Sequence, residues 1–152
     1  LVKNESIIGN KIVLLDNVQD PGNVGTIIRS ALAFNVSTIV MSPDSVNIYN
    51  DKLIRSTEGT IFNMNIVVMP LSEAIEKIHQ MGIKVYYADM YGSINLDDAD
   101  IKDYALVLGS EGKGISEYIR KEADYGINIP MNDKCESLNV SVSGGIIMYK
   151  FR

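Results

Sequence analysis

Short runs of mostly apolar residues recur along this chain and alternate with segments in which apolar residues follow helical spacing. The runs lie at residues 11–15, 38–41, 65–69, 84–88, 104–108 and 126–129. Strands of this composition are buried on both faces, and they are typical of parallel sheets whose crossover helices cover both sides. The sequence therefore predicts an α/β domain built on a mainly parallel sheet with helices on both faces.

Helices are expected in five of the segments that join or follow these strands. The predicted helices lie at residues 23–32, 50–62, 72–81, 116–123 and 137–151. In the first helix Asn23 is the predicted N-cap, after a turn formed by Asp20, Pro21 and Gly22, and in the third the predicted N-cap is Ser72. The acidic run at residues 97–100 is expected to be a solvated loop.

The chain is large enough for one globular domain with a core, because 46% of its 152 residues are hydrophobic and 22% are charged. The lone Cys135 cannot form an internal disulfide, which favours a reducing compartment. No segment resembles a signal peptide or an apolar span that could cross a membrane, so we expect a soluble, cytoplasmic protein. Because Leu1 is not an initiator methionine, we also expect sequence upstream of it.

The formal net charge is −5, whereas proteins that bind nucleic acids usually gather Lys and Arg against the phosphates. The overall charge therefore argues mildly against a nucleic-acid partner. A local basic patch is still compatible with this sequence, because four basic residues fall in or near the segments with functional features. These residues are Arg29, Lys52, Arg55 and Lys113.

Three segments combine a strand end with unusual polar or glycine-rich chemistry, and they span residues 16–29, 109–114 and 129–143. In parallel α/β sheets, ligands bind outside the carboxyl ends of the strands. Residues 137–145 (SLNVSVSGG) place an asparagine and three serines among apolar residues, where unpaired polar groups are costly. This pattern is typical of a functional site.

Two of these segments have a structural alternative when each is considered alone. The middle one, GSEGKG, is either a tight glycine turn or a loop that lets a ligand approach backbone amides. It lacks the spacing of a phosphate-binding P-loop, because Lys113 is followed by Gly114, and it does not match G-x-G-x-x-G. In the first segment, Arg29 is either a solvated helix residue or one that leans back toward the strand end.

In order and spacing, the three segments resemble the three motifs of the SpoU/TrmH family of SPOUT methyltransferases. That family transfers a methyl group from S-adenosylmethionine to a ribose 2'-hydroxyl of tRNA or rRNA. The first motif is matched by Asn17, Pro21, Asn23, Gly25 and Arg29, the second by Gly109, Glu111, Gly112 and Gly114, and the third by Ile129, Pro130, Met131 and residues 137–141. Residues 55–62 (RSTEGTIF) also resemble the family's link between its second and third strands. One departure is Asn35, where family members often carry glycine; asparagine tolerates the same left-handed conformation.

The resemblance implies a C-terminal trefoil knot, a rare exception among protein folds, and a homodimer with cofactor pockets beside the subunit interface. It identifies residues 1–152 as a single SPOUT catalytic domain, and an N-terminal RNA-binding domain missing from this chain would reconcile its acidity with an anionic substrate. The apolar tail at residues 145–151 fits either a helix buried at that interface or an ordinary core helix.

The resemblance also implies which residues form the site. S-adenosylmethionine is expected to contact Ala88, Leu108, Gly109, Gly112, Ile129, Met131, Ser137 and Leu138. Catalysis is expected to involve Arg29, Asn23, Glu111, Ser137 and Asn139, with Ser143 as a weaker candidate. Because an arginine stays protonated, we expect Arg29 to grip the phosphate beside the ribose and to stabilise the developing alkoxide. Glu111 either orders its glycine-rich loop or acts in the chemistry.

Other reactive side chains favour structural interpretations. His79 has no second ligand at suitable spacing, so a solvated helix residue is expected and no metal is predicted. Cys135 lies in a polar loop and is expected to be a bystander thiol. RNA is the expected partner, with no membrane. The alternative function is a knotted, cofactor-binding dimer that serves as an RNA-binding or scaffold module without turnover, and the joint presence of the five catalytic candidates favours the enzyme.

Overall fold

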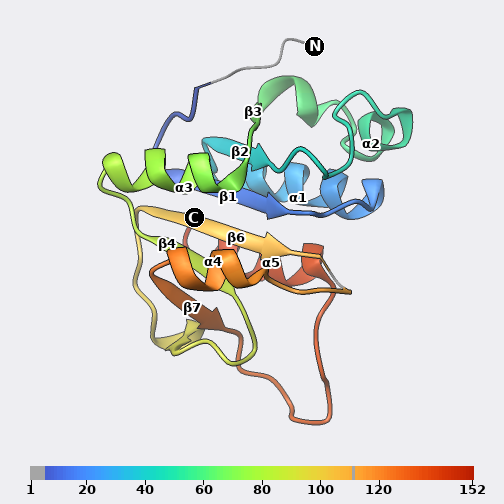
Figure 1. The fold of residues 1–152 in the computed structure, drawn as a ribbon. Coiled ribbons are helices and arrows are strands. Elements are labelled where there is room, and N and C mark those ends of the chain that lie inside the picture. The colour runs from blue at the N-terminus through green and yellow to red at the C-terminus, as the bar shows by residue number, and fades with distance from the viewer. Residues whose placement is uncertain (1–5, 111) are drawn as a thin grey trace.

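A seven-stranded sheet organises the chain in the computed structural model, which describes residues 6–110 and 112–152 (Figure 1). Its strands are β1 (Lys11–Asp16), β2 (Thr38–Met41), β3 (Asn65–Val68), β4 (Val85–Ala88), β5 (Ile94–Asn95), β6 (Tyr104–Gly109) and β7 (Tyr125–Asn128). They follow the order β3-β2-β1-β6-β4-β7-β5, and each pairing between them is parallel. The predicted parallel sheet is confirmed.

Helices cover both faces of this sheet, as predicted (Figure 1). The helices are α1 (Pro21–Ala33), α2 (Asp51–Ser56), α3 (Leu71–Gln80), α4 (Glu117–Glu122) and α5 (Val140–Lys150), with 3₁₀ turns η1 (Thr60–Asn63) and η2 (Leu96–Asp98). Helices α1 and α5 pack on one face, and α3 and α4 pack on the other. Among the described residues, no helix is long and apolar enough to cross a membrane.

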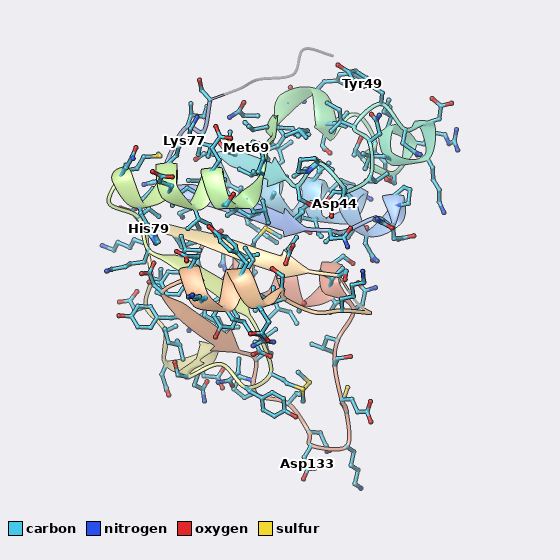
Figure 2. The ribbon with its side chains drawn as sticks, viewed as in Figure 1. Asp44, Tyr49, Met69, Lys77, His79 and Asp133 are labelled. Atoms are coloured by element: carbon cyan, nitrogen blue, oxygen red, sulfur yellow. The ribbon has the colours of Figure 1, made fainter. Side chains whose placement is uncertain are left out.

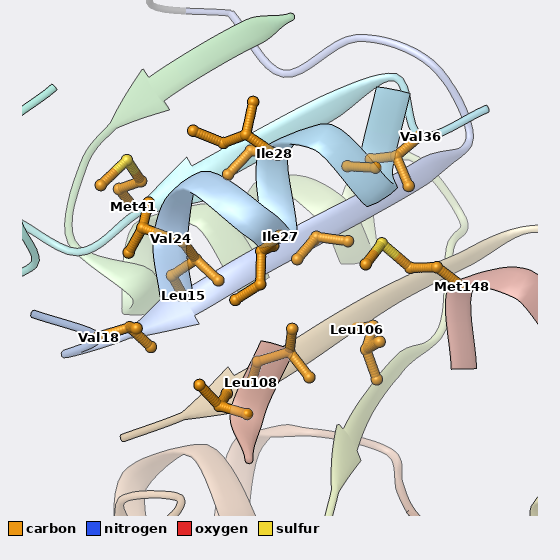
Figure 3. Close-up of a cluster of buried hydrophobic side chains, with 14 of the residues drawn as sticks. Leu15, Val18, Val24, Ile27, Ile28, Val36, Met41, Leu106, Leu108 and Met148 are labelled. Atoms are coloured by element: carbon orange, nitrogen blue, oxygen red, sulfur yellow. The ribbon is translucent and has the colours of Figure 1, made fainter. Parts of the chain in front are cut away.

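Strand β1 explains why the apolar runs are almost continuous. Its side chains alternate between the two faces, so Val13 and Leu15 enter the core beneath α1 and α5, whereas Ile12 and Leu14 enter the core beneath α3 and α4. All four are fully buried. Figure 3 shows the first of these cores, in which residues of β1, α1, β6 and α5 meet. A central parallel strand thus needs apolar residues at every position.

Two helices begin earlier than predicted because proline opens each of them. Helix α1 starts at Pro21, and its N-cap is Asp20, whose carboxylate accepts a hydrogen bond from the Asn23 amide at 2.9 Å. The prediction of Asn23 as the cap is therefore wrong, since Asn23 lies inside the first turn. Helix α3 starts directly after Pro70, and no side chain caps it, so the assignment of Ser72 as a cap is also wrong.

The predicted helix at residues 50–62 is interrupted. Helix α2 ends at Ser56, and the chain then passes through Glu58 and Gly59 with φ values of 51° and 87° before η1 begins. The left-handed conformation is incompatible with a continuous helix. Asn35 has a φ of 67°, which confirms the left-handed conformation expected there.

The chain ends and sheet edge differ from the prediction in smaller ways. Helix α5 begins at Val140 and not at residue 137, because Asn139 caps it through hydrogen bonds to the next turn. The last strand is shifted by one residue, to Tyr125–Asn128. The acidic run, predicted to be a loop, overlaps η2 at residues 97–98. It lies after β5, a two-residue strand that is too short to leave an apolar run in the sequence.

Gly25, in the first of the three motif segments, is required by helix packing. A Cβ atom there would collide with the Ser56 side chain and lie 3.1 Å from the Ser56 carbonyl carbon. Helices α1 and α2 therefore approach each other at the glycine. This contact fixes the loop that follows α2 relative to the exposed face of α1.

Candidate active site

A pocket of about 440 Å³ opens at the carboxyl ends of β4, β6 and β7, where they meet the start of α5. Its lining consists of Ala88, Asp89, Met90, Leu108, Gly109, Ser110, Gly114, Ile115, Arg120, Ile127, Ile129, Met131, Ser137, Leu138, Asn139, Val140 and Ser143. This volume falls within the range of small-molecule sites. The walls combine aliphatic side chains with glycine backbone and a few polar groups.

Most of the residues predicted to hold a cofactor share this pocket. Those in its lining are Ala88, Leu108, Gly109, Ile129, Met131, Ser137 and Leu138. Gly112 is not part of the lining. The pocket thus brings together the end of β4 and the second and third motif segments, which are far apart in sequence.

The second motif segment is both a tight turn and a pocket wall. The Gly114 amide donates to the Ser110 carbonyl at 2.7 Å, and Gly114 has a φ of 66°. A Cβ atom on Gly109 would lie 2.5 Å from the Gly114 carbonyl oxygen and 2.9 Å from the Ile115 nitrogen. The turn at Gly114 can therefore pack against the end of β6 only because residue 109 is glycine. Glu111, a predicted catalytic residue, lies outside the described residues.

An amide pair joins the first and third motif segments. The Asn139 Nδ2 group donates a hydrogen bond to Asn23 Oδ1 at 3.0 Å, across 116 positions of sequence. The Asn139 Oδ1 atom accepts from the Ser141 and Val142 amides, which caps α5. Asn139 thus ties the pocket rim to the first turn of α1, and this link needs both asparagines.

Arg29 lies on the exposed side of α1 and is not part of the pocket lining. Its guanidinium Nη2 lies 3.3 Å from Glu58 Oε2, on the left-handed turn after α2. Both side chains are largely exposed, at 48% and 69%. Of the two alternatives that its spacing left open, the structure supports the exposed helix residue, which here forms a surface ion pair with Glu58. Within one chain, the pocket and Arg29 are separate features.

Asp89 and Arg120 form an ion pair inside the pocket that the sequence did not predict. Asp89 directly follows β4, and Arg120 reaches it from α4 through a direct hydrogen bond. The guanidinium also lies 5.6 Å from the centre of the Tyr87 ring. The hydrogen bond to Asp89 raises the pKa of Arg120 above its ordinary value. Asp89 could have been suspected because it follows Ala88 at a strand end, but Arg120 had no such signal.

His79 is an exposed residue of α3, as predicted, and it also contacts a carboxylate that the sequence did not predict. Its Nε2 atom lies 2.8 Å from Asp124 Oδ2, which also accepts a hydrogen bond from the Val85 amide. Burial acts to raise the pKa of Asp124, but the two hydrogen bonds, together with the charges of His79 and Lys84, outweigh it and lower the pKa. Figure 2 shows His79 on α3, away from the long loop that carries Asp133.

No group of three His, Cys, Asp or Glu side chains that could hold a metal ion occurs within residues 6–110 and 112–152. The thiol of Cys135 is exposed on the loop between β7 and α5. The polar groups that line the pocket are a carboxylate, a guanidinium, hydroxyls, an amide and backbone groups.

Comparison with known proteins identifies relatives along nearly the whole chain. The model of the SpoU rRNA Methylase family matches residues 10–149. The chain is 32% identical over 143 residues to the 23S rRNA (guanosine(2553)-2'-O)-methyltransferase RlmP of Bacillus subtilis. It is 36% identical over 149 residues to the 23S rRNA (adenosine(1067)-2'-O)-methyltransferase of Streptomyces laurentii. These matches cover 93% and 96% of this chain but 58% and 55% of the relatives, so the chain spans little more than half of their length.

Solved structures have the same fold. The SpoU methyltransferase AviRb of Streptomyces viridochromogenes, in complex with AdoMet, superposes with a TM-score of 0.86 at 29% identity, over 95% of this chain and 58% of that one. The AdoMet-bound rRNA methyltransferase of Sinorhizobium meliloti gives a TM-score of 0.88 at 29% identity, over 98% of this chain and 58% of that one. The shared region contains nearly all of the present chain.

Proposed function

The chain belongs to the SpoU rRNA methylase family, and from that premise we propose that it is the catalytic domain of an S-adenosylmethionine-dependent RNA ribose 2'-O-methyltransferase. The observation that carries this proposal is the pocket at the strand ends, which combines residues of the second and third motifs. The bond between Asn139 and Asn23 links that pocket to the first motif. The substrate is an rRNA or a tRNA, and the cytoplasm is the proposed location.

The pocket fits S-adenosylmethionine in size and in chemistry. Leu108, Ile129 and Leu138 offer apolar surface to an adenine ring, and Gly109 lets a ligand approach the backbone. When bound, the cofactor supplies an electrophilic methyl group on a sulfonium. Residues of this chain have to hold the ribose hydroxyl in line with that methyl group, and alignment of this kind can supply much of the acceleration.

Arg29 is the proposed catalytic residue that handles the charge of the substrate. Its guanidinium stays protonated and has a planar set of donors, which suits a bidentate contact with the phosphate beside the target ribose. The same cation stabilises negative charge that develops on the 2'-oxygen as its proton departs to phosphate or water. We propose that the site is shaped by the side chains of Asn23, Ser137 and Asn139. For Glu111 the two proposed roles are to order the glycine-rich loop or to act in the chemistry.

Glu58 is expected to compete with RNA phosphate for Arg29, because the two side chains form an exposed ion pair. Exposed pairs contribute about 0.2–1 kcal/mol, so Glu58→Gln should lower the KM for RNA by up to about fivefold, with kcat nearly unchanged. The measurement is methyl transfer over a range of RNA concentrations. Glu73→Gln, which breaks the exposed pair with Lys77 on α3, is the matched control. A fall in kcat for Glu58→Gln would instead mean that Glu58 orients Arg29.

We infer that the domain acts as a homodimer, with the trefoil knot of its family near the C-terminus. The support for a dimer is the outer side of α5, where Val142, Ile146 and Tyr149 are between 40% and 49% exposed. Helix α1 packs beside α5, so a second copy seated on α5 would also approach the α1 surface that carries Arg29. An active site completed by Arg29 of the partner subunit would explain why this residue is absent from the pocket of its own chain.

Ile146→Glu is expected to convert the dimer to a monomer and to remove most methyl transfer, because a buried, unpaired carboxylate is costly at an interface. Sedimentation equilibrium measures the mass, and a methyl-transfer assay measures activity. Met81→Glu is the control, because Met81 is 43% exposed at the end of α3 and outside α5. A variant that stays dimeric would contradict this placement of the interface.

The activity is tested by incubating the full-length protein with radiolabelled S-adenosylmethionine and total RNA, and then mapping the label. The full-length protein is used because we propose that an N-terminal part supplies RNA affinity to this acidic domain. Label on a ribose 2'-oxygen is the expected result. Cofactor binding in calorimetry without transfer to any RNA would favour the alternative, an RNA-binding or scaffold dimer.

A further inference from the structure

The ion pair of Asp89 and Arg120 is the charged element of a pocket whose other side chains are apolar or neutral. Asp89 directly follows Ala88, the last residue of β4, and its side chain is only 13% exposed. A carboxylate in such a position has to be compensated by a cation or by hydrogen-bond donors. Arg120 supplies part of this compensation from a different element, α4.

We propose that Asp89 recognises the ribose of the cofactor by accepting hydrogen bonds from its hydroxyl groups, and that Arg120 is the positioning residue that holds this carboxylate. The inference rests on the proposed function, because it assumes that the pocket binds S-adenosylmethionine. It adds two residues that lie outside the three motif segments. One of them, Arg120, has no neighbour in sequence among the predicted site residues.

The hydrogen bonds of Asp89 leave capacity for a ligand. Arg120 Nη1 bonds to Oδ2, whereas Oδ1 has no hydrogen-bond partner among residues 6–110 and 112–152. An ionised carboxylate can accept about four hydrogen bonds in total. The Asp89 amide is itself fixed, because it donates to the Ile127 carbonyl at 3.0 Å beside β7. The acceptor is therefore held on both sides and remains available in the pocket.

The charge balance favours a hydroxyl donor over the α-amino group of the cofactor. Arg120 already neutralises Asp89, so an ammonium group would have to compete with a guanidinium at hydrogen-bond distance. Neutral hydroxyls need no such exchange and can add to the pair. In other α/β sheets that bind nucleotides, an acidic side chain accepts a hydrogen bond from a ribose hydroxyl in the same way.

Two ligands separate the two ends of the cofactor. S-adenosylhomocysteine carries adenine, ribose and the amino-acid end, whereas 5'-methylthioadenosine carries adenine and ribose without the amino-acid end. Calorimetry on the full-length protein should show that Asp89→Asn weakens both ligands by a similar factor, about tenfold or more, as expected for a hydrogen bond to a charged group. Removing the ribose 2'- or 3'-hydroxyl from methylthioadenosine should then reduce affinity for the wild type more than for Asp89→Asn.

Arg120 is tested through its conservative variant. Arg120→Ala should weaken both ligands, and Arg120→Lys should restore part of the loss, because lysine keeps a cation beside Asp89 but not the planar fork. Asp44→Asn is the control, since Asp44 is an exposed carboxylate outside the pocket (Figure 2). Thermal unfolding of each variant shows whether a loss of affinity comes from a loss of folded protein.

Three results would overturn the inference. If Asp89→Asn weakens S-adenosylhomocysteine but not methylthioadenosine, Asp89 reads the amino-acid end. If neither ligand is affected, the ion pair only joins α4 to β4. If the wild-type protein binds neither ligand, both the proposed function and the inference fail. This result can be told from the other two because it is seen without any variant.

Discussion

Arg29→Lys is expected to lose methyl transfer by about 10²-fold or more in kcat, while it binds S-adenosylmethionine as tightly as the wild type. Lysine keeps the positive charge but presents a single point charge, so it cannot make the bidentate contact with phosphate. Cofactor affinity should be unchanged because Arg29 is outside the pocket lining of its own chain, and the proposed contact of the partner's Arg29 is with the RNA phosphate. Steady-state methyl transfer at saturating RNA measures kcat, and calorimetry with the cofactor measures its affinity.

Arg55→Lys is the control for this prediction. Arg55 is an exposed arginine on α2, outside the pocket lining and without the Glu58 pairing of Arg29. The same change at Arg55 keeps the positive charge that a basic patch needs against RNA phosphate, so kcat should stay near that of the wild type. Near wild-type turnover in Arg29→Lys would remove Arg29 from the proposed mechanism. A loss of cofactor binding in that variant would show that Arg29 of the partner subunit also contributes to the pocket.

The strands could be predicted from sequence because burial on both faces leaves a continuous apolar run. Strand β5 was missed because two residues leave no such signal. Helix boundaries were less predictable, since Pro21 and Asp20 compete with Asn23 for the start of α1 and only the backbone conformation decides between them. The break after α2 depends on the left-handed φ of Glu58. Glutamate rarely adopts this conformation, so the break could not be predicted from the sequence.

The pocket was predictable where its residues belong to motifs and unpredictable where they come from elsewhere. Leu138 and Asn139 could be found because polar residues interrupt an apolar segment there and because that segment resembles the third motif of the family. Arg120 could not, because an arginine on a short amphipathic helix is usually a solvated side chain, and only the position of α4 over the end of β4 brings it to Asp89. The pairing of Arg29 with Glu58 has the same origin, since it depends on how closely α2 packs on α1 at Gly25.

Gly109→Ala is expected to destabilise the domain by about 1–3 kcal/mol, the usual cost of overpacking, and to abolish cofactor binding. The added Cβ would lie 2.5 Å from the Gly114 carbonyl oxygen, and backbone cannot rotate away as a side chain can. The turn that forms one wall of the pocket would have to move from the end of β6. Chemical denaturation measures the free energy of unfolding, and calorimetry with S-adenosylhomocysteine measures binding.

Gly112→Ala is the control for Gly109→Ala. It shows whether a loss of stability comes from backbone crowding at Gly109 or from any replacement of glycine in this turn. A Cβ atom on Gly112 would have no neighbour within 4 Å among the described residues, so its free energy of unfolding should equal that of the wild type. Calorimetry on Gly112→Ala tests the predicted contact of Gly112 with S-adenosylmethionine. A variant with wild-type stability but weaker cofactor binding would support that contact. If Gly109→Ala kept wild-type stability and affinity, the turn would be able to open without loss of the pocket. The close approach of Gly109 to Gly114 would then be incidental to binding, and the glycines of the second motif would need another explanation.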